Sequence, residues 1–390
     1  MKPETPLSAR AAVRGLSASK IRELYNEGIG KAEVLAFWVG EPDEPTPEFI
    51  RKAGTDSIAA GELFYTHNLG IPELREALAG YLTRLHRKTV AGEVALTSAG
   101  VNALMLASQL LVDPGDRVVE VVPLWPNLLE IPKILGAHVT TVPLDFSPGG
   151  WKLDLDRLID ALTPDTRALY LNSPNNPTGW VITREEQAVL LEHCRRHGIW
   201  IFADDAYERL YFGPGGVAPS FLDRMDEGDR VISANTFSKS WLMTGWRLGW
   251  LVVPPSLLAD LGKLIEYNTS CAPVFVQRAG IAALTHGEPV VARTLERFRS
   301  ARDFLFAELK SIPGVRVARP DGTMYAFLSI EGITDSLAFC KHLVRSQGLG
   351  LAPGSAFGPE GEGYVRWCFA ASQERLADGI GRLRRALESR

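Results

Sequence analysis

The sequence has 390 residues, of which 46% are hydrophobic and 23% are charged, and its formal net charge is −4. A chain of this length exceeds what one hydrophobic core usually serves, so we expect two domains. The mildly acidic balance excludes the basic footprint of a nucleic-acid-binding protein. No apolar run approaches the roughly 20 residues that a membrane helix needs. The four cysteines are widely scattered, which predicts neither disulfides nor a metal site and favours a reduced, cytoplasmic setting.

Short apolar runs alternate with helical patterns through the middle of the chain. The runs expected to form strands span residues 93–97, 117–123, 168–172, 199–203, 231–235 and 248–253. Continuous apolar runs suit strands buried on both faces, and their alternation with helices indicates an α/β fold with a mostly parallel central sheet flanked by helices. Helices are expected at 101–112 and at 184–197, where Thr183 and Glu186 are placed to form a capping box.

The pattern changes beyond residue 280. The expected helices there span 289–311 and 335–347, and the expected strands span 325–330 and 364–369. This order indicates a smaller α+β domain. We therefore expect a large domain over residues 46–280 and a small domain that combines residues 1–45 with residues 281–390. The N-terminal segment is too short to fold alone, so it is expected to pack on the small domain or on a partner subunit.

Three polar motifs each follow an expected strand directly. They are Asn172–Gly179, Asp204–Tyr207 and Thr236–Lys239. In an open parallel sheet, ligands bind beyond the carboxyl ends of the strands. An amide, a carboxylate and a lysine are therefore expected at one edge of the sheet. Strand alternation points Asp204 and Asp205 in opposite directions, so only one of them is expected to face that edge.

Lys239 has the most distinctive chemistry of these groups. A lysine amine attacks carbonyl groups when burial or neighbouring cations lower its pKa. The alternative is an ordinary surface lysine, but the apolar and aromatic flanks, which include Trp241 and Trp250, favour burial. The turn Thr97–Asn102 before an expected helix offers backbone amides to an anion such as phosphate, although such a turn often has only a structural role.

The run Ser238–Trp250 resembles the cofactor-lysine motif of the class I/II aminotransferases, which are pyridoxal-phosphate-dependent enzymes of fold type I. Other segments resemble the remaining signatures of this family, in the family's order and spacing: Val39–Asp43, Tyr65 with Gly70 and Glu73–Arg75, Asn172–Gly179, Asp204–Tyr207, Pro353–Gly358 and Tyr364–Arg366. The resemblance covers nearly the whole chain. It implies the fold type I architecture and a pyridoxal 5'-phosphate cofactor.

The resemblance implies a role for each residue around the cofactor ring. Lys239 matches the lysine that forms a Schiff base with the cofactor and later moves a proton to and from the substrate Cα. Asp204 matches the carboxylate that pairs with the pyridine nitrogen and keeps the ring protonated as an electron sink. Tyr207 and Asn176 match the groups that hydrogen-bond the phenolic oxygen of the ring. Trp125 matches the aromatic residue that stacks on its face.

The resemblance also implies the phosphate and substrate contacts. The phosphate contacts are the amides of Gly100 and Val101, the hydroxyls of Thr236 and Ser238, Arg247, and Tyr65 reaching across from a second subunit. The last of these implies a homodimer with shared active sites. Arg366 matches the arginine that grips the α-carboxylate of the substrate in bidentate fashion. The residues expected beside it are Asn176, Gly40 and Trp38.

We therefore expect an enzyme that moves the α-amino group of an amino acid to a 2-oxo acid by ping-pong chemistry. The same motifs would serve a carbon–sulfur β-lyase or a cyclase that uses the same cofactor, because they specify the bond to the cofactor and not the reaction that follows. A third alternative is a regulatory domain that senses pyridoxal phosphate, although the short N-terminus offers no DNA-binding module. Some aspartate-preferring members carry a lysine near the place of Val101, so aspartate specificity is not predicted.

Overall fold

The computed structural model describes residues 8–147 and 149–388. Its largest sheet has seven strands in the order β2-β10-β9-β8-β7-β3-β4, and within it only β10 runs antiparallel to its neighbours. The strands are β2 (Val94–Thr97), β3 (Arg117–Val122), β4 (His138–Pro143), β7 (Thr166–Asn172), β8 (Trp200–Asp204), β9 (Val231–Thr236) and β10 (Gly249–Val252). The α/β fold class with a mostly parallel sheet is confirmed.

Helices cover both faces of this sheet because its strands are apolar on both sides. On β3, Val118 and Val122 pack in one cluster with Leu104 of α5, whereas Val119 and Val121 pack on the opposite face in a second cluster. The helices of this part are α3 (Glu48–Ala59), α4 (Pro72–Leu85), α5 (Gly100–Leu111), α6 (Pro126–Leu135), α7 (Leu155–Ala161), α8 (Arg184–His197), α9 (Leu258–Glu266) and α10 (Val274–His286). Helix α8 begins with the predicted capping box, in which Thr183 and Glu186 bond each other's backbone amides.

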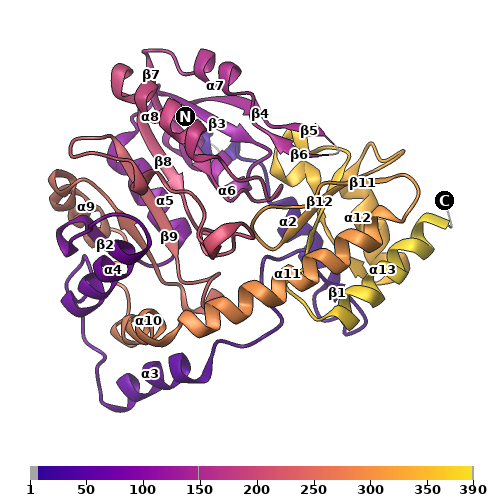
Figure 1. Ribbon diagram of the computed structural model, residues 1–390, viewed down its shortest axis with the longest axis horizontal. Helices are drawn as coiled ribbons and strands as arrows, with labels where there is room; N and C mark the ends of the chain where they lie inside the picture. The colour runs from indigo at the N-terminus through magenta and orange to yellow at the C-terminus, as the bar shows by residue number, and fades with distance from the viewer. Residues whose placement is uncertain (1–7, 148, 389–390) are drawn as a thin grey trace, which may run out of the picture.

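A smaller antiparallel sheet lies beside the large one, in the order β11-β12-β15-β14. Figure 1 shows the two sheets in separate lobes, with the long helix α11 running from one lobe to the other. The elements of this part are α11 (Glu288–Lys310), β11 (Val315–Val317), β12 (Tyr325–Ile330), α12 (Ser336–Gln347), β13 (Leu349–Gly350), β14 (Ala352–Pro353), β15 (Tyr364–Cys368) and α13 (Gln373–Glu388).

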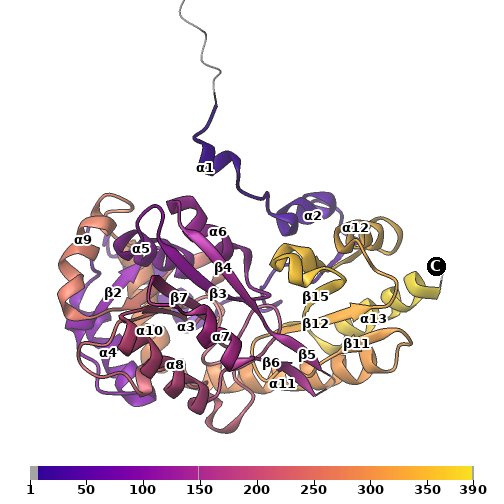
Figure 2. The ribbon, with the colours of Figure 1, turned by 90° about the horizontal axis from the view of Figure 1, so that it is seen from above.

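The N-terminal residues lie against the C-terminal part of the chain. Strand β1 (Leu35–Ala36) pairs in parallel with β13, and α2 (Lys20–Gly28) packs against α12, as Figure 2 shows. A short helix α1 (Ala11–Arg14) precedes α2. Residues 1–7 and 389–390 of the expected small domain lie outside the described residues, and the domain boundaries stay a prediction.

The sequence did not predict the edge strand β4 or the hairpin formed by β5 (Asp145–Ser147) and β6 (Gly150–Lys152). Only one position of β4 is fully buried, so its sequence lacks the continuous apolar run that marks the central strands. Trp151 on β6 packs against Phe327 and Tyr364 of the small sheet, with ring centroids 5.8 and 5.4 Å apart. The hairpin therefore joins the two lobes.

Glu120 is an exception inside the large sheet. It lies on β3 beside Thr141 and Tyr170 of the neighbouring strands, its side chain is fully buried, and neither carboxylate oxygen has a hydrogen-bond partner among the described residues. Burial raises the pKa of Glu120 from 4.5 to about 8. The folded protein therefore holds a neutral carboxylic acid here at neutral pH.

We expect Glu120→Gln to stabilise the protein at pH 8 and to have little effect at pH 4.5. Because the folded-state pKa of Glu120 is raised, the folded state binds one proton more than the unfolded state between pH 4.5 and about 8, and stability falls across that window. Glutamine keeps the shape without this proton, so the gain at pH 8 is roughly 2–4 kcal/mol. Urea unfolding between pH 4.5 and 9 measures it. The control Glu192→Gln, at an exposed position of α8, should leave the pH profile unchanged.

Candidate active site

A cavity of about 400 Å³ lies at the carboxyl ends of β7, β8 and β9 and is closed on its other side by residues of α2, β12 and β15. All the site residues named from the sequence, except Tyr65, line this cavity. They are Trp38, Gly40, Gly100, Val101, Trp125, Asn176, Asp204, Tyr207, Thr236, Ser238, Lys239, Arg247 and Arg366. Residues more than 300 positions apart in the chain therefore meet in one place.

Lys239 follows β9 and lines the cavity from a turn in which Phe237 and Trp241 are buried. Its Nζ donates a hydrogen bond to the carbonyl oxygen of Gly40 at 2.9 Å and lies 5.6 Å from the ring centroid of Tyr207. Burial lowers the pKa of the Lys239 amine to about 8, with a smaller contribution from the Arg366 guanidinium. A substantial fraction of this amine is therefore neutral just above neutral pH, which is the form that attacks a carbonyl carbon.

Asp204 ends β8 and is the carboxylate that faces the cavity. Its Oδ1 accepts a hydrogen bond from the amide of Ala206 at 3.2 Å, and the side-chain amide of Asn172 donates to its backbone carbonyl at 3.1 Å. Asp205 does not line the cavity and accepts a hydrogen bond from Ser233 at 2.6 Å. Burial raises the pKa of Asp204 to about 7. A cation opposite Asp204 would hold it ionised, and no ion pair with it occurs among the described residues.

Side-chain contacts hold the turn that follows Asp204 in place. Glu208 Oε2 lies 3.1 Å from Nε2 of His86, whose Nδ1 lies 2.8 Å from Asp223. Arg209 forms a bidentate ion pair with Glu288 at the start of α11, and both N–O distances are 2.8 Å. These contacts hold the backbone next to Tyr207, whose hydroxyl lies 2.8 Å from the hydroxyl of Tyr325. The Tyr207 ring is therefore held at the cavity wall from two elements.

Arg366 on β15 is a buried cation without an anion. It is 2% exposed, and its guanidinium carbon lies 4.2 Å from the Tyr325 ring centroid. One terminal nitrogen donates to Asn176 Oδ1 at 3.0 Å and the other to the carbonyl of Trp38, while Nε has no hydrogen-bond partner. No salt bridge within residues 8–147 and 149–388 involves it. Since burying an unpaired charge is costly, the site is built to receive an anion here.

The opposite end of the cavity offers amides and hydroxyls. Helix α5 begins at Gly100 with no side-chain cap, so its first amides point to the cavity unpaired by a capping side chain. A Cβ atom at Gly100 would lie 3.1 Å from the Cβ of Thr236, which explains the glycine in this tight approach. Thr236 and Ser238 hydroxyls lie 2.9 Å apart, and Arg247 lines the same wall from an exposed position. Helix amides, hydroxyls and a guanidinium together suit a phosphate.

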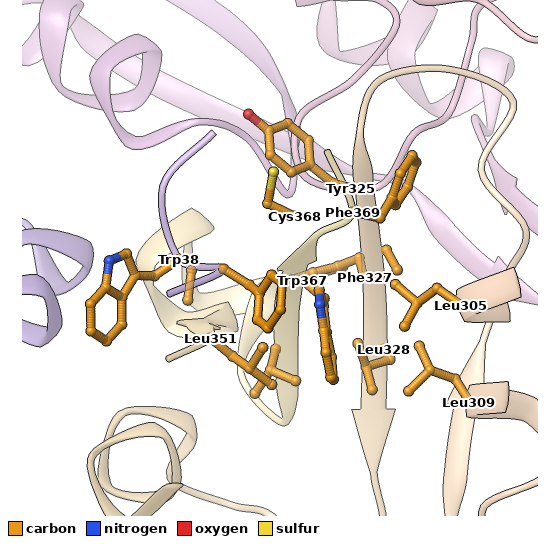
Figure 3. Packing of buried hydrophobic residues seen from close by; sticks show 14 of the residues in the cluster. Trp38, Leu305, Leu309, Tyr325, Phe327, Leu328, Leu351, Trp367, Cys368 and Phe369 are labelled. Carbon is orange, nitrogen blue, oxygen red and sulfur yellow. The ribbon is translucent and has the colours of Figure 1, made fainter. Parts of the chain in front are cut away.

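Sequence reasoning missed several cavity residues. Tyr325 lies in a strand that was expected, but nothing in the sequence indicated that its hydroxyl faces the site. Figure 3 shows Tyr325 next to Cys368, its register partner on β15. Arg22 and Tyr25 on α2 line the cavity without belonging to any motif. Tyr65 is 90% exposed and lies outside the cavity of its own chain.

The described residues offer neither a cluster of metal ligands nor a helix suited to crossing a membrane. No group of three or more His, Cys, Asp or Glu side chains there could hold a metal ion. Within residues 8–147 and 149–388, no helix combines the length and apolar character needed to cross a membrane.

The model of the family "Aminotransferase class I and II" matches residues 32–383. The chain belongs to this family. It is 33% identical to an aspartate aminotransferase from Pyrococcus horikoshii over 96% of this chain and 95% of the relative. It is 34% identical to an arginine–pyruvate transaminase from Pseudomonas aeruginosa over 90% of this chain and 89% of the relative.

Solved structures agree with the sequence relatives. N-succinyldiaminopimelate aminotransferase from Mycobacterium tuberculosis superposes with a TM-score of 0.91 at 30% identity, covering 97% of this chain and 100% of that chain. The prediction of an aminotransferase is therefore confirmed, and the protein is an enzyme that acts on amino acids. The relatives are named for different amino acids, so membership of the family leaves the substrate open.

Proposed function

We propose that this aminotransferase binds pyridoxal 5'-phosphate in the cavity and bonds it covalently through Nζ of Lys239. One observation carries the proposal: three kinds of group line the same cavity. They are an amine of lowered pKa, a buried carboxylate that forms no ion pair among the described residues, and backbone amides and hydroxyls that suit a phosphate. The amine suits the aldehyde of this cofactor, the carboxylate suits its ring nitrogen, and the amides and hydroxyls suit its phosphate. When bound, the cofactor withdraws the electron pair released at the substrate Cα.

The residues around the ring would have the following roles. Asp204 would face the pyridine nitrogen, whose positive charge compensates the buried carboxylate. Tyr207 and Asn176 would hydrogen-bond the phenolic oxygen, and Trp125 at the start of α6 would stack on the ring. The phosphate would be held by Gly100, Val101, Thr236, Ser238 and Arg247.

The remaining groups would act on the substrate. Arg366 would hold the α-carboxylate, supported by Asn176, while Gly40 and Trp38 close the same end. Two parallel hydrogen bonds from a planar guanidinium fix the orientation of Cα. The Lys239 amine, once free, would carry a proton between the substrate Cα and the cofactor, because its lowered pKa leaves a substantial fraction of it neutral just above neutral pH.

Absorbance spectroscopy of the holoenzyme tests this function. An amino acid alone should convert the cofactor to its amine form, and a 2-oxo acid should then restore the starting spectrum. A β-lyase would instead release ammonia from the amino acid without needing any 2-oxo acid. Protein that stays colourless when saturated with pyridoxal phosphate would contradict the proposal.

We further propose a cytoplasmic homodimer in which Tyr65 reaches the phosphate of the neighbouring site. Tyr65 and Phe64 are 90% and 85% exposed in the single chain, and such aromatic exposure is typical of a covered interface. Tyr65→Phe should raise the dissociation constant of the cofactor by about tenfold, the worth of roughly one hydrogen bond to a charged group. Equilibrium dialysis measures this change, and sedimentation measures the dimer. The control Tyr211→Phe removes the hydroxyl of a half-buried tyrosine that does not line the cavity and should bind cofactor normally.

A further inference from the structure

Helix α2 supplies a cation to the cavity that none of the roles above uses. Ser19, Arg22 and Tyr25 all line the cavity. The helix start is fixed, since the Ser19 hydroxyl accepts a hydrogen bond from the Arg22 amide at 3.2 Å, and Lys20 Nζ donates to the carbonyl of Ser355 at 3.2 Å. Packing of α2 against α12 holds it over the small sheet (Figure 2). Because the helix is held in this way, Arg22 has a fixed position at the cavity wall.

A continuous path of contacts places Arg22 relative to Arg366. The guanidinium carbon of Arg22 lies 4.9 Å from the Tyr25 ring centroid, and the Tyr25 ring lies edge-on to Trp38 with centroids 6.2 Å apart. The carbonyl of Trp38 accepts a hydrogen bond from Arg366. Besides Arg247, two guanidinium groups thus line the cavity, with Trp38 and Tyr25 between them.

Arg22 is exposed at the mouth of the cavity, unlike Arg366, and no ion pair with it occurs among the described residues. Its only charged or aromatic contact there is the Tyr25 ring, which supports the flat face of the guanidinium and leaves its N–H edge free. A planar guanidinium edge matches a carboxylate in geometry and charge. A substrate that places its α-carboxylate on Arg366 would direct its side chain along the Trp38 wall toward Arg22.

We propose that Arg22 binds the distal carboxylate of a dicarboxylic amino acid and of the matching 2-oxo acid. The proposal rests on the proposed function, because it assigns the α-carboxylate to Arg366. Val101 at the other side of the cavity is apolar and offers no charge. Glu41 is the acidic lining residue that a basic side chain could use, but it adjoins Gly40, whose carbonyl accepts the Lys239 hydrogen bond, so it lies at the lysine end.

Binding of unreactive acids to the holoenzyme tests this proposal without any turnover. Glutarate and valerate each have five carbons, but only glutarate has a second carboxylate. Calorimetry should show that Arg22→Gln weakens glutarate binding by about 10- to 100-fold and valerate binding by less than about threefold. Arg22→Lys should recover part of the loss, since it keeps the charge without the planar edge. The control Lys31→Gln removes one positive charge just after the same helix, outside the cavity, and should bind both acids as the wild type does.

Single-turnover reactions of the amine form give the second readout. The rate with 2-oxoglutarate at low concentration should fall in Arg22→Gln by the same factor as glutarate affinity, while the rate with pyruvate should be preserved. Equal losses for both oxo acids, or wild-type preference for pyruvate or for a basic amino acid, would overturn the proposal. In those outcomes the enzyme still exchanges amino groups, so the result is distinct from a failure of the proposed function, in which no amino acid changes the cofactor spectrum.

Discussion

Replacing Lys239 with alanine is expected to abolish the visible absorbance that borohydride reduces and to lower turnover by about 10²–10⁴-fold from lost proton transfer alone. The variant lacks the nitrogen that bonds the aldehyde and the base that reaches Cα. Its cofactor should still bind, because the phosphate and ring contacts come from other residues. Mass spectrometry after borohydride treatment should find no cofactor attached to the peptide that contains position 239.

Two comparisons make this prediction specific. Lys52→Ala removes an exposed lysine of α3 and should leave the spectrum and the labelled peptide unchanged. Circular dichroism should show that Lys239→Ala stays folded, since the lysine side chain makes a single hydrogen bond within the described part of the chain, to Gly40. Borohydride labelling that persists on another lysine would reject Lys239 as the attachment point.

The sequence predicted those parts of the site that local chemistry specifies. Motifs that follow β7, β8 and β9 had to meet, because parallel strands end at one edge of a sheet. The orientation of Asp204 and Asp205 likewise follows from the alternation of a strand, whose side chains face opposite sides at successive positions. The capping box of Thr183 and Glu186 is equally local, and helix α8 spans the predicted residues 184–197.

The parts that the sequence did not predict depend on tertiary contacts. Strand β4 is largely exposed, so its residues carry no periodic signal, and only pairing with β3 makes it a strand. Tyr325 and Arg22 reach the cavity because the small sheet, with α2 packed on it, lies beside the large sheet. No spacing along the chain encodes that placement. The burial of Glu120 without a partner has no sequence signal either, since glutamate is ordinarily exposed.

The buried charges of the cavity indicate what the protein must bind. Asp204 and Arg366 are buried, and neither forms an ion pair with another of the described residues. Each arrangement lowers the stability of the unliganded protein. A ligand that brings a ring cation to one and a carboxylate to the other compensates both. The cavity is therefore better suited to a cofactor and an amino acid bound together than to either one alone.

Arg366→Ala is therefore expected to weaken the binding of both amino acids and 2-oxo acids by about 2–5 kcal/mol, because a buried carboxylate loses its partner. Half-reaction titrations with each substrate measure the loss. The cofactor should remain covalently attached, since Arg366 makes no hydrogen bond to Lys239 among the described residues.

Arg366→Lys should recover only part of this affinity, because an ammonium group cannot form two parallel hydrogen bonds with a carboxylate. The control Arg316→Ala removes an exposed arginine from β11 of the same sheet and should bind substrates normally. If Arg366→Ala reacted with amino acids as the wild type does, the α-carboxylate would have to lie elsewhere in the cavity. Arg22 would then be the remaining guanidinium able to receive it, and its substitution would impair monocarboxylic and dicarboxylic substrates alike.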